Sequence, residues 1–341
     1  LIELSSYNPR SMLSLQVKIM VRILVSLLLL IAIIFIGGCP ALTEKKENNI
    51  PNSGLLALVN QTCGTRYYES NFPVDTRLFE HPWLVQFGYE RELVVNYVFQ
   101  GLLIHSKYVL TTVFVVQFQD FGQLKYARVG EHNTSTNTDC EKLSLLEETC
   151  APLAQSILVD EVIVHPDYNM FAQINDIALV KLRVAAIVDG TAVAPICVND
   201  DLNYQSSFLL VASWCGRRET GLSLVPKQYF MKPISPYECQ RLMPRHSVSF
   251  ANGMFCIVFD ERHTNSTELA YEPNLRGGSG APIYTVHDGN RILLVGLLSY
   301  GPRYPAKLHE PYVIIPVAPF YDWMTGVIEA DREKHMYNTL I

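Results

Sequence analysis

A serine flanked by glycines, Ser279 in the stretch GGSGAP (277–282), has the surroundings of a nucleophile for acyl transfer. This chemistry needs a hydroxyl, a base within hydrogen-bond reach, a carboxylate that orients the base, and backbone N–H donors for the oxyanion. Glycines suit the loop because the chain must turn sharply there. The carboxylate candidate is Asp176, directly before the apolar run of INDIALVKL (174–182). Each stretch alone is weak evidence, since a Gly-Ser turn is often only a turn and Asp176 could be a carboxylate at a strand edge.

The elements that would position these residues are short strands. From about Pro82 onward, runs of β-branched and aromatic residues alternate with Gly, Pro, Asn and Asp, which predicts an all-β barrel or sandwich. One amphipathic helix is predicted near the C-terminus, in PFYDWMTGVIEA (319–330). The apolar residues that share one face of this helix are Phe320, Trp323, Met324, Val327 and Ile328.

The composition and the N-terminus indicate an exported protein. The 341-residue chain has a formal net charge of -6, a hydrophobic content of 49% and no stripe of Lys and Arg, which argues against a nucleic-acid partner. Near the N-terminus, Arg22 precedes an apolar run, 23–36, in which Ser26 is the one polar residue, and then small residues. The run is shorter than the roughly 20 residues of a spanning helix, so we predict that residues 1–41 are an upstream segment and a cleaved signal peptide. A membrane anchor and a lipid-modified Cys39 are the alternatives.

Residues 42–62 are predicted to be a short polar linker. Export also predicts disulfides. Of the eight cysteines, removal of Cys39 with the signal peptide leaves seven, so one thiol has no partner within the chain. Sequons for N-glycosylation begin at Asn60, Asn133 and Asn265, which agrees with export.

The order of several motifs resembles that of the chymotrypsin/trypsin family of serine proteases. The motifs are EHPWLVQF (80–87), GLLIHSKYVLTTVFVV (101–116), INDIALVKL, VASWCG (211–216) and GGSGAP. The likeness spans 63–330 and is greatest to the clip-domain group of arthropod proteases, because 127–169 looks like their inserted loop. It implies a double six-stranded antiparallel β-barrel with a C-terminal helix, followed by a tail, 331–341. The clip module itself is not expected, since 42–62 contains no cysteine.

The sequence departs from this family where the family performs catalysis. The family's TAAHC is TTVFV here, so Phe114 takes the position of the base histidine and offers Ser279 no proton acceptor. Removing the base from such a triad lowers turnover about 10⁶-fold. His105 and His287 are the alternative bases, and we expect neither in the right place. Asp176 and Ser279 are thus predicted to be vestigial triad positions.

The zymogen switch and the specificity pocket also depart from the family. Gly278 replaces the aspartate that, in the family, pairs with the new α-amino group after activation. The family's R-IVGG cleavage motif falls on 69–73, which does not match it. The resemblance assigns the specificity pocket to Pro273, Ser299, Gly301 and Tyr312, and the Tyr312 ring is expected to fill it.

The cysteines follow the family in part. The resemblance implies the disulfides Cys63–Cys197, Cys140–Cys150 and Cys239–Cys256 and leaves Cys215 unpaired. We expect Cys215 to be a buried, inert thiol, with an intermolecular disulfide as the alternative. The family bridge beside the base is replaced by Phe99 and Val115, and Leu275 replaces one half of the bridge beside the serine.

Two carboxylates raise further expectations. A buried Asp176 must be protonated or hydrogen-bonded, and Thr112 and Ser299 are the candidate donors. Glu131 takes a position at which some relatives bind calcium. Because a calcium site needs about six to eight oxygen ligands and the sequence places one, we expect Glu131 to be a solvated acid, with no metal and no cofactor.

The resemblance and its departures together imply a secreted, non-catalytic protease homologue. Its expected role is to bind extracellular proteins, namely proteases or zymogens of a cascade such as that of melanisation or another immune response. No membrane association is expected after the signal peptide is cleaved. The competing hypotheses are an active endopeptidase with an unusual base, and a membrane-tethered ectodomain.

Overall fold

The computed structural model of the protein describes residues 63–65, 75–144, 146–198, 200, 209–215, 223–243, 248, 250–260, 275–287, 291–302 and 309–339. Several predictions lie outside these residues: the signal peptide and the linker, the altered cleavage motif at 69–73, the sequons at Asn60 and Asn265, and Pro273. In the part of the chain that is described, no helix is long and apolar enough to cross a membrane.

Six antiparallel strands of the N-terminal half close into a barrel, in the order β1-β2-β3-β8-β7-β4. The strands are β1 (Leu84–Arg91), β2 (Val94–His105), β3 (Tyr108–Thr111), β4 (Gln123–Val129), β7 (Gln155–Val164) and β8 (Ala178–Leu182). Alternate side chains of β1 point to opposite faces, so Val85 and Phe87 fill the barrel while Leu84 packs in a second cluster outside it.

Six strands of the C-terminal half form the second barrel, in the order β13-β10-β11-β12-β15-β14, and β13 pairs with β14 to close it. The strands are β10 (Leu209–Ser213), β11 (Lys227–Ile234), β12 (Phe255–Phe259), β13 (Pro282–His287), β14 (Arg291–Tyr300) and β15 (Tyr312–Pro316). A short strand, β9 (Cys197–Val198), adds to β14 in parallel. This is the double six-stranded barrel that the resemblance implied.

The main apolar cluster joins the two barrels and the C-terminal helix. Leu84 and Leu110 of the first barrel share this cluster with Leu210 of the second and with Met324 of the helix. The neighbours of Leu210 in sequence, Leu209 and Val211, instead fill the second barrel. One face of β10 therefore lines the inside of the second barrel, and the other face packs in the cluster shared with the first barrel.

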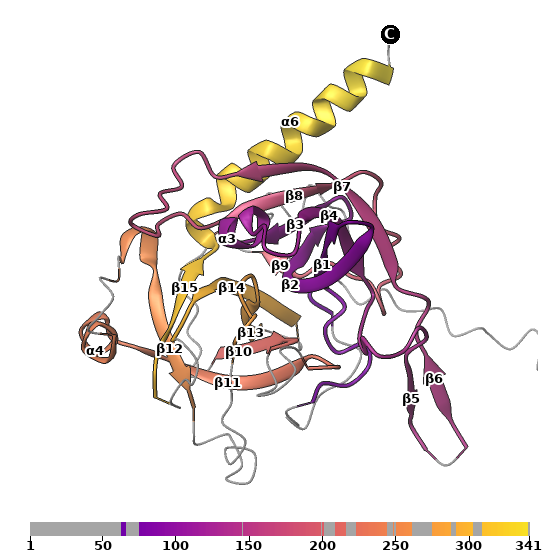
Figure 1. Ribbon diagram of the computed structural model, residues 1–341, viewed down its shortest axis with the longest axis horizontal. Coiled ribbons are helices and arrows are strands. Elements are labelled where there is room, and N and C mark those ends of the chain that lie inside the picture. The colour runs from indigo at the N-terminus through magenta and orange to yellow at the C-terminus, as the bar shows by residue number, and fades with distance from the viewer. Residues whose placement is uncertain are drawn as a thin grey trace, which may run out of the picture. The chain divides into compact units, whose positions relative to one another are not determined.

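The α-helices of the described residues are α3 (Val113–Gln117), α4 (Pro236–Leu242) and α6 (Tyr321–Thr339). In addition, β5 (Cys140–Lys142) pairs with β6 (Glu148–Cys150) in a hairpin that projects from the barrels (Figure 1). The face of the terminal helix that the sequence predicted to be apolar packs in the main cluster. Met324 and Ile328 of α6 are buried there, and so is Phe320, directly before the helix. The helix continues through Thr339, so the boundary expected at residue 330 falls inside it. Beyond that point Asp331 still pairs with Lys181, at 2.5 Å.

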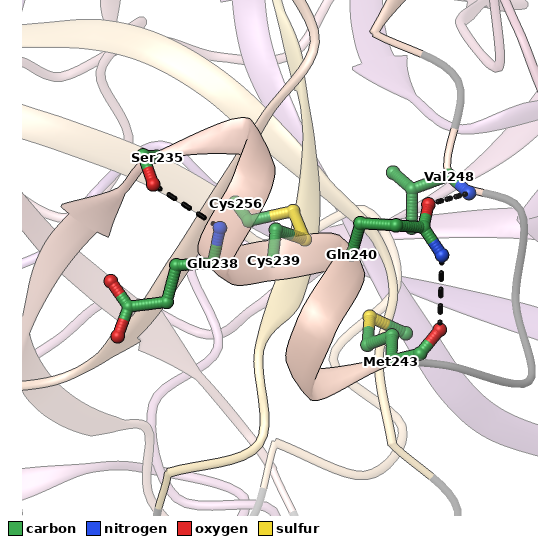
Figure 2. Close-up of a disulfide and its surroundings, with 7 residues drawn as sticks. All are labelled: Ser235, Glu238, Cys239, Gln240, Met243, Val248 and Cys256. Atoms are coloured by element: carbon green, nitrogen blue, oxygen red, sulfur yellow. Dashed lines mark hydrogen bonds between the residues drawn. A yellow bond between two sulfur atoms is a disulfide. The ribbon is translucent and has the colours of Figure 1, made fainter.

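The disulfides of the structure are Cys63–Cys197, Cys140–Cys150 and Cys239–Cys256, and Cys215 is a buried free thiol. Figure 2 shows how one of them is placed: Cys239 lies on α4 and reaches Cys256 on β12. α4 begins at Pro236, and the Ser235 hydroxyl caps its first turn by accepting a hydrogen bond from the N–H of Glu238 at 3.2 Å. These pairings are those that the resemblance implied.

Candidate active site

Ser279 lies in a tight loop directly before β13. Gly277 and Gly280 on either side have φ values of 79° and 82°, which L side chains rarely adopt. A Cβ on Gly280 would lie 2.1 Å from the carbonyl oxygen of Gln100, so only glycine fits. The N–H of Gly280 donates to Leu298 at 2.9 Å, which fixes the loop against β14. The half-buried Ser279 hydroxyl donates to the carbonyl oxygen of Ser299 at 3.0 Å.

Asp176 is buried just before β8 and faces the same end of β14. Its Oδ2 accepts from the Ser299 hydroxyl at 2.5 Å, and its Oδ1 accepts from the backbone N–H of Phe114 at 3.1 Å. Burial raises the pKa of the Asp176 carboxyl, while the bonds from Ser299 and from the N–H groups of Phe114 and Val113 act in the opposite direction.

The expectation that Thr112 donates to Asp176 was wrong, whereas the expectation for Ser299 was correct. The Thr112 hydroxyl is buried without a hydrogen-bond partner among the described residues. Thr112 is instead the N-cap residue of α3, and the first backbone N–H groups of that helix take its place at the carboxylate.

Phe114, at the position of the base, lies in α3 and is 45% exposed. Its ring packs edge-on against Phe99 at 5.5 Å between centroids and lies 5.6 Å from Phe118. Phe99 also packs on Phe118, and Phe118 on Phe121, which makes a continuous aromatic cluster. Phe99, which takes the place of one half of the family bridge, thus packs on aromatic rings, and the sequence did not identify Phe118 or Phe121 as its partners.

No histidine is among the hydrogen-bond partners that the described residues offer to Asp176 or Ser279. His105 accepts the N–H of Lys107 through Nδ1, in the turn between β2 and β3. Burial, followed by the nearby Lys107 charge, lowers the pKa of His105. The His287 side chain lies outside the part of the structure that can be described.

Tyr312 closes the space where the resemblance places the specificity pocket. Its side chain is buried on β15, and a Cβ on Gly301 would lie 2.2 Å from the Tyr312 ring. The Tyr312 hydroxyl accepts from the backbone N–H of Leu275 in the serine loop at 3.4 Å. The ring therefore spans from the end of β14 to the serine loop, with Phe259 packed edge-on at 5.8 Å.

Gly278 leaves no carboxylate for a zymogen switch, and neutral groups lie beside it. A Cβ on Gly278 would lie 2.7 Å from the carbonyl oxygen of Leu275, and 3.5 Å from both the Ser213 hydroxyl and the Leu298 side chain. Ser213 in turn accepts from the Gln100 side chain at 2.5 Å. Sequence reasoning missed Gln100, since its position in FQGLLI reads only as part of a strand.

Glu131 is not the solvated acid that the sequence predicted. Its side chain is 1% exposed, and its Oε2 lies 2.7 Å from the Arg128 guanidinium. The positive φ of 75° at Gly130 turns the chain back so that Arg128 and Glu131 meet. Nearby, Asn133 of the one described sequon is half-buried and accepts from the Ser135 hydroxyl at 2.7 Å.

The comparisons with known proteins agree with this geometry. The trypsin family model matches residues 74–324. The chain is 31% identical to CLIP domain-containing serine protease HP8 of Bombyx mori, over 86% of this chain and 79% of that protein. It is 28% identical to the Spaetzle-processing enzyme of Drosophila melanogaster, over 79% and 69% of the two chains.

Among solved structures, the crystal structure of the Drosophila Grass clip serine protease of the Toll pathway has a similar fold. The TM-score is 0.67 at 22% sequence identity, and the match covers 82% of this chain and 79% of that one. The family model extends over most of the chain, from ten residues before β1 into α6. The chain belongs to the trypsin family.

Proposed function

We propose that this protein is a secreted, non-catalytic member of the trypsin family that acts by binding components of an extracellular protease cascade. The observation that carries the proposal is the contact between Phe114 and Asp176. The N–H of Phe114 donates to the carboxylate that would orient an imidazole, so Phe114 stands at the position of the base, and its side chain is a hydrocarbon ring. Among the described residues, Ser279 therefore has no hydrogen-bonded group that can remove its proton.

Two further contacts support the absence of catalysis. The Ser279 hydroxyl donates to the carbonyl of Ser299, which is a very weak base. The buried Tyr312 ring occupies the space against Gly301 in which a substrate side chain would be held. Loss of the base alone costs about 10⁶-fold in turnover, and loss of the binding pocket removes the orientation of the substrate as well.

A protein of this fold without catalysis can still bind partners through the loops that its rigid barrels hold in place. The names of its relatives suggest the setting: the Spaetzle-processing enzyme and a phenoloxidase-activating enzyme from Bombyx mori act on other components of insect cascades. We take proteases or zymogens of such an immune cascade as the partners. Secretion is supported by the disulfides of the structure and by the signal peptide that the sequence predicts.

The test separates binding from catalysis by changing only the hydroxyl. Purified wild-type protein and Ser279→Ala are added to insect haemolymph, and the rate of phenoloxidase activation is measured. A binding role predicts that both proteins change the rate to the same extent. If only the wild type acts, the protein is an active endopeptidase and the proposal is wrong.

A matched control excludes a difference in folding. The two proteins must show the same melting temperature, which is expected because Ser279 is half-buried and makes one hydrogen bond within the described residues. If neither protein changes the rate, the cascade role fails although the absence of catalysis stands.

A further inference from the structure

The loop that follows β4, residues 130–139, is organised around one buried ion pair. Arg128, near the end of β4, places its guanidinium 2.7 Å from Oε2 of Glu131. The same guanidinium lies over the ring of Tyr97, 5.2 Å from its centroid. A planar cation between a carboxylate and an aromatic face is held by both, and Arg suits this place better than Lys.

Asp139, which ends this loop, supplies a second inward-facing carboxylate. Its Oδ2 accepts from the backbone N–H groups of His132 and Asn133 at 3.0 and 2.8 Å, and its Oδ1 accepts from the Thr136 hydroxyl at 2.5 Å. The two acids lie close enough to interact: burial and then the Asp139 charge raise the pKa of Glu131, whereas the Arg128 charge lowers it. Arg128 supplies the positive charge beside Glu131, whose carboxyl also hydrogen-bonds to Asp139.

Glu131 takes a position at which the resemblance places a calcium ligand in some relatives. Calcium takes about six to eight oxygen ligands. Here three of the four carboxylate oxygens accept hydrogen bonds from the loop: the His132 N–H is shared by Oε1 of Glu131 and Oδ2 of Asp139, and the Thr136 hydroxyl donates to Oδ1 of Asp139. The fourth oxygen, Oε2 of Glu131, accepts no hydrogen bond among the described residues and lies 2.7 Å from the Arg128 guanidinium. Among the described residues no cluster of His, Cys, Asp and Glu could hold a metal ion. The donor set does not fit calcium.

Backbone oxygens of the loop are engaged as well. The carbonyl of His132 accepts from the indole N–H of Trp214 at 3.1 Å, and the carbonyl of Asp139 accepts from the N–H of Ala151 at 2.8 Å. The carbonyl of Asn133 accepts from the N–H of Thr136 at 3.0 Å. These bonds hold the carbonyl oxygens of the loop in their present directions.

We propose that the Arg128 guanidinium is the built-in cation of the 130–139 loop, so that the loop holds its shape without a divalent metal. This inference does not depend on the proposed function. The consequence reaches beyond the loop, because Trp214 and Leu224 belong to the second half of the chain, and Leu224 accepts the N–H of Thr134 at 2.9 Å. Arg128 thus positions a connection between the two halves of the protein.

The experiment measures thermal unfolding of the full secreted protein with calcium chloride and with EDTA. The wild type is expected to show the same melting temperature in both. Arg128→Gln leaves two crowded carboxylates without their cation, so its melting temperature should fall by roughly 5 °C or more in EDTA. Calcium should then restore part of that loss, because the freed carboxylates become ligands for it.

Two further variants separate charge from packing. Arg128→Lys keeps the positive charge and should remain insensitive to calcium, with a smaller loss of stability. The double change of Arg128→Gln with Glu131→Gln removes the need for a cation and should be more stable than Arg128→Gln alone. The proposal is overturned if EDTA destabilises the wild type, if Arg128→Gln melts like the wild type, or if the double variant is no more stable than the single one.

Discussion

The hydroxyl of Ser299 donates a hydrogen bond to Oδ2 of Asp176 at 2.5 Å. The carbonyl of the same residue accepts from the Ser279 hydroxyl at 3.0 Å. The two positions that a serine protease connects through an imidazole are therefore connected here through one serine. This connection cannot remove the Ser279 proton, since Ser279 donates to a carbonyl oxygen and not to a base.

Asp176→Asn tests the burial of the carboxylate. The pKa of Asp176 is raised above its ordinary value in the folded state, so the folded protein binds the proton more tightly than the unfolded chain. The stability that this proton provides is present at low pH and is lost as pH rises through the folded pKa. We expect the free energy of unfolding, measured in urea, to fall for the wild type relative to Asp176→Asn as pH rises from 4 toward neutrality. If the two proteins show parallel pH profiles, Asp176 is not a buried group that titrates in this range.

Tyr312→Ala tests whether the ring closes the pocket. Removing a fully buried aromatic ring costs about 3–5 kcal/mol of unfolding free energy. The cavity left against Gly301 should bind a small aromatic compound such as indole, which would raise the melting temperature of the variant and not that of the wild type.

Tyr312→Phe is the matched control, because it keeps the ring and removes only the hydroxyl that accepts from Leu275. It should cost about 1 kcal/mol. Equal stability of Tyr312→Ala and Tyr312→Phe would mean that the ring does not fill the pocket.

Cys215 should be inert in the folded protein. Its side chain is fully buried, and burial raises the pKa of the thiol to about 12. Iodoacetamide at neutral pH should leave Cys215 unmodified until the protein is unfolded in urea without reductant, as peptide mapping would show. Modification in the folded state, or a dimer that reductant separates at Cys215, would favour the intermolecular disulfide instead.

Phe114→His should not restore hydrolysis of peptide substrates. The new imidazole could reach Asp176, but the Tyr312 ring still occupies the pocket and Gly278 still provides no carboxylate for the activation switch. A chromogenic peptide assay should therefore give the same background rate for Phe114→His as for the same variant carrying Ser279→Ala. A higher rate in the first would show that pocket and switch are functional after all.

Residue identities predicted much of this site because the changed groups are side chains. The resemblance assigned Phe114 to the position of the base, and Tyr312 and Ser299 to the specificity pocket, because each lies in a motif that can be aligned with the family. The donor to Asp176 was harder to predict. Backbone N–H groups at the start of α3 bind the carboxylate, and the direction of a main-chain N–H is set by the fold and not by the residue type.

Glu131 shows the other limit of the sequence. Arg128 and Glu131 lie three residues apart across a strand end, where they would normally diverge. They meet because Gly130 takes a left-handed conformation, and that choice depends on the surrounding loop. The length of α6 was likewise underestimated, because beyond residue 330 contacts such as Asp331–Lys181 replace an apolar face.

The most direct test of the central claim is labelling of the purified protein with a fluorophosphonate, which reacts with serines that an adjacent base activates. We predict that Ser279 remains unlabelled, at the level of Ser279→Ala, while an active trypsin in the same experiment is labelled completely. Stoichiometric labelling of Ser279 in the wild type, absent from Ser279→Ala, would contradict the account.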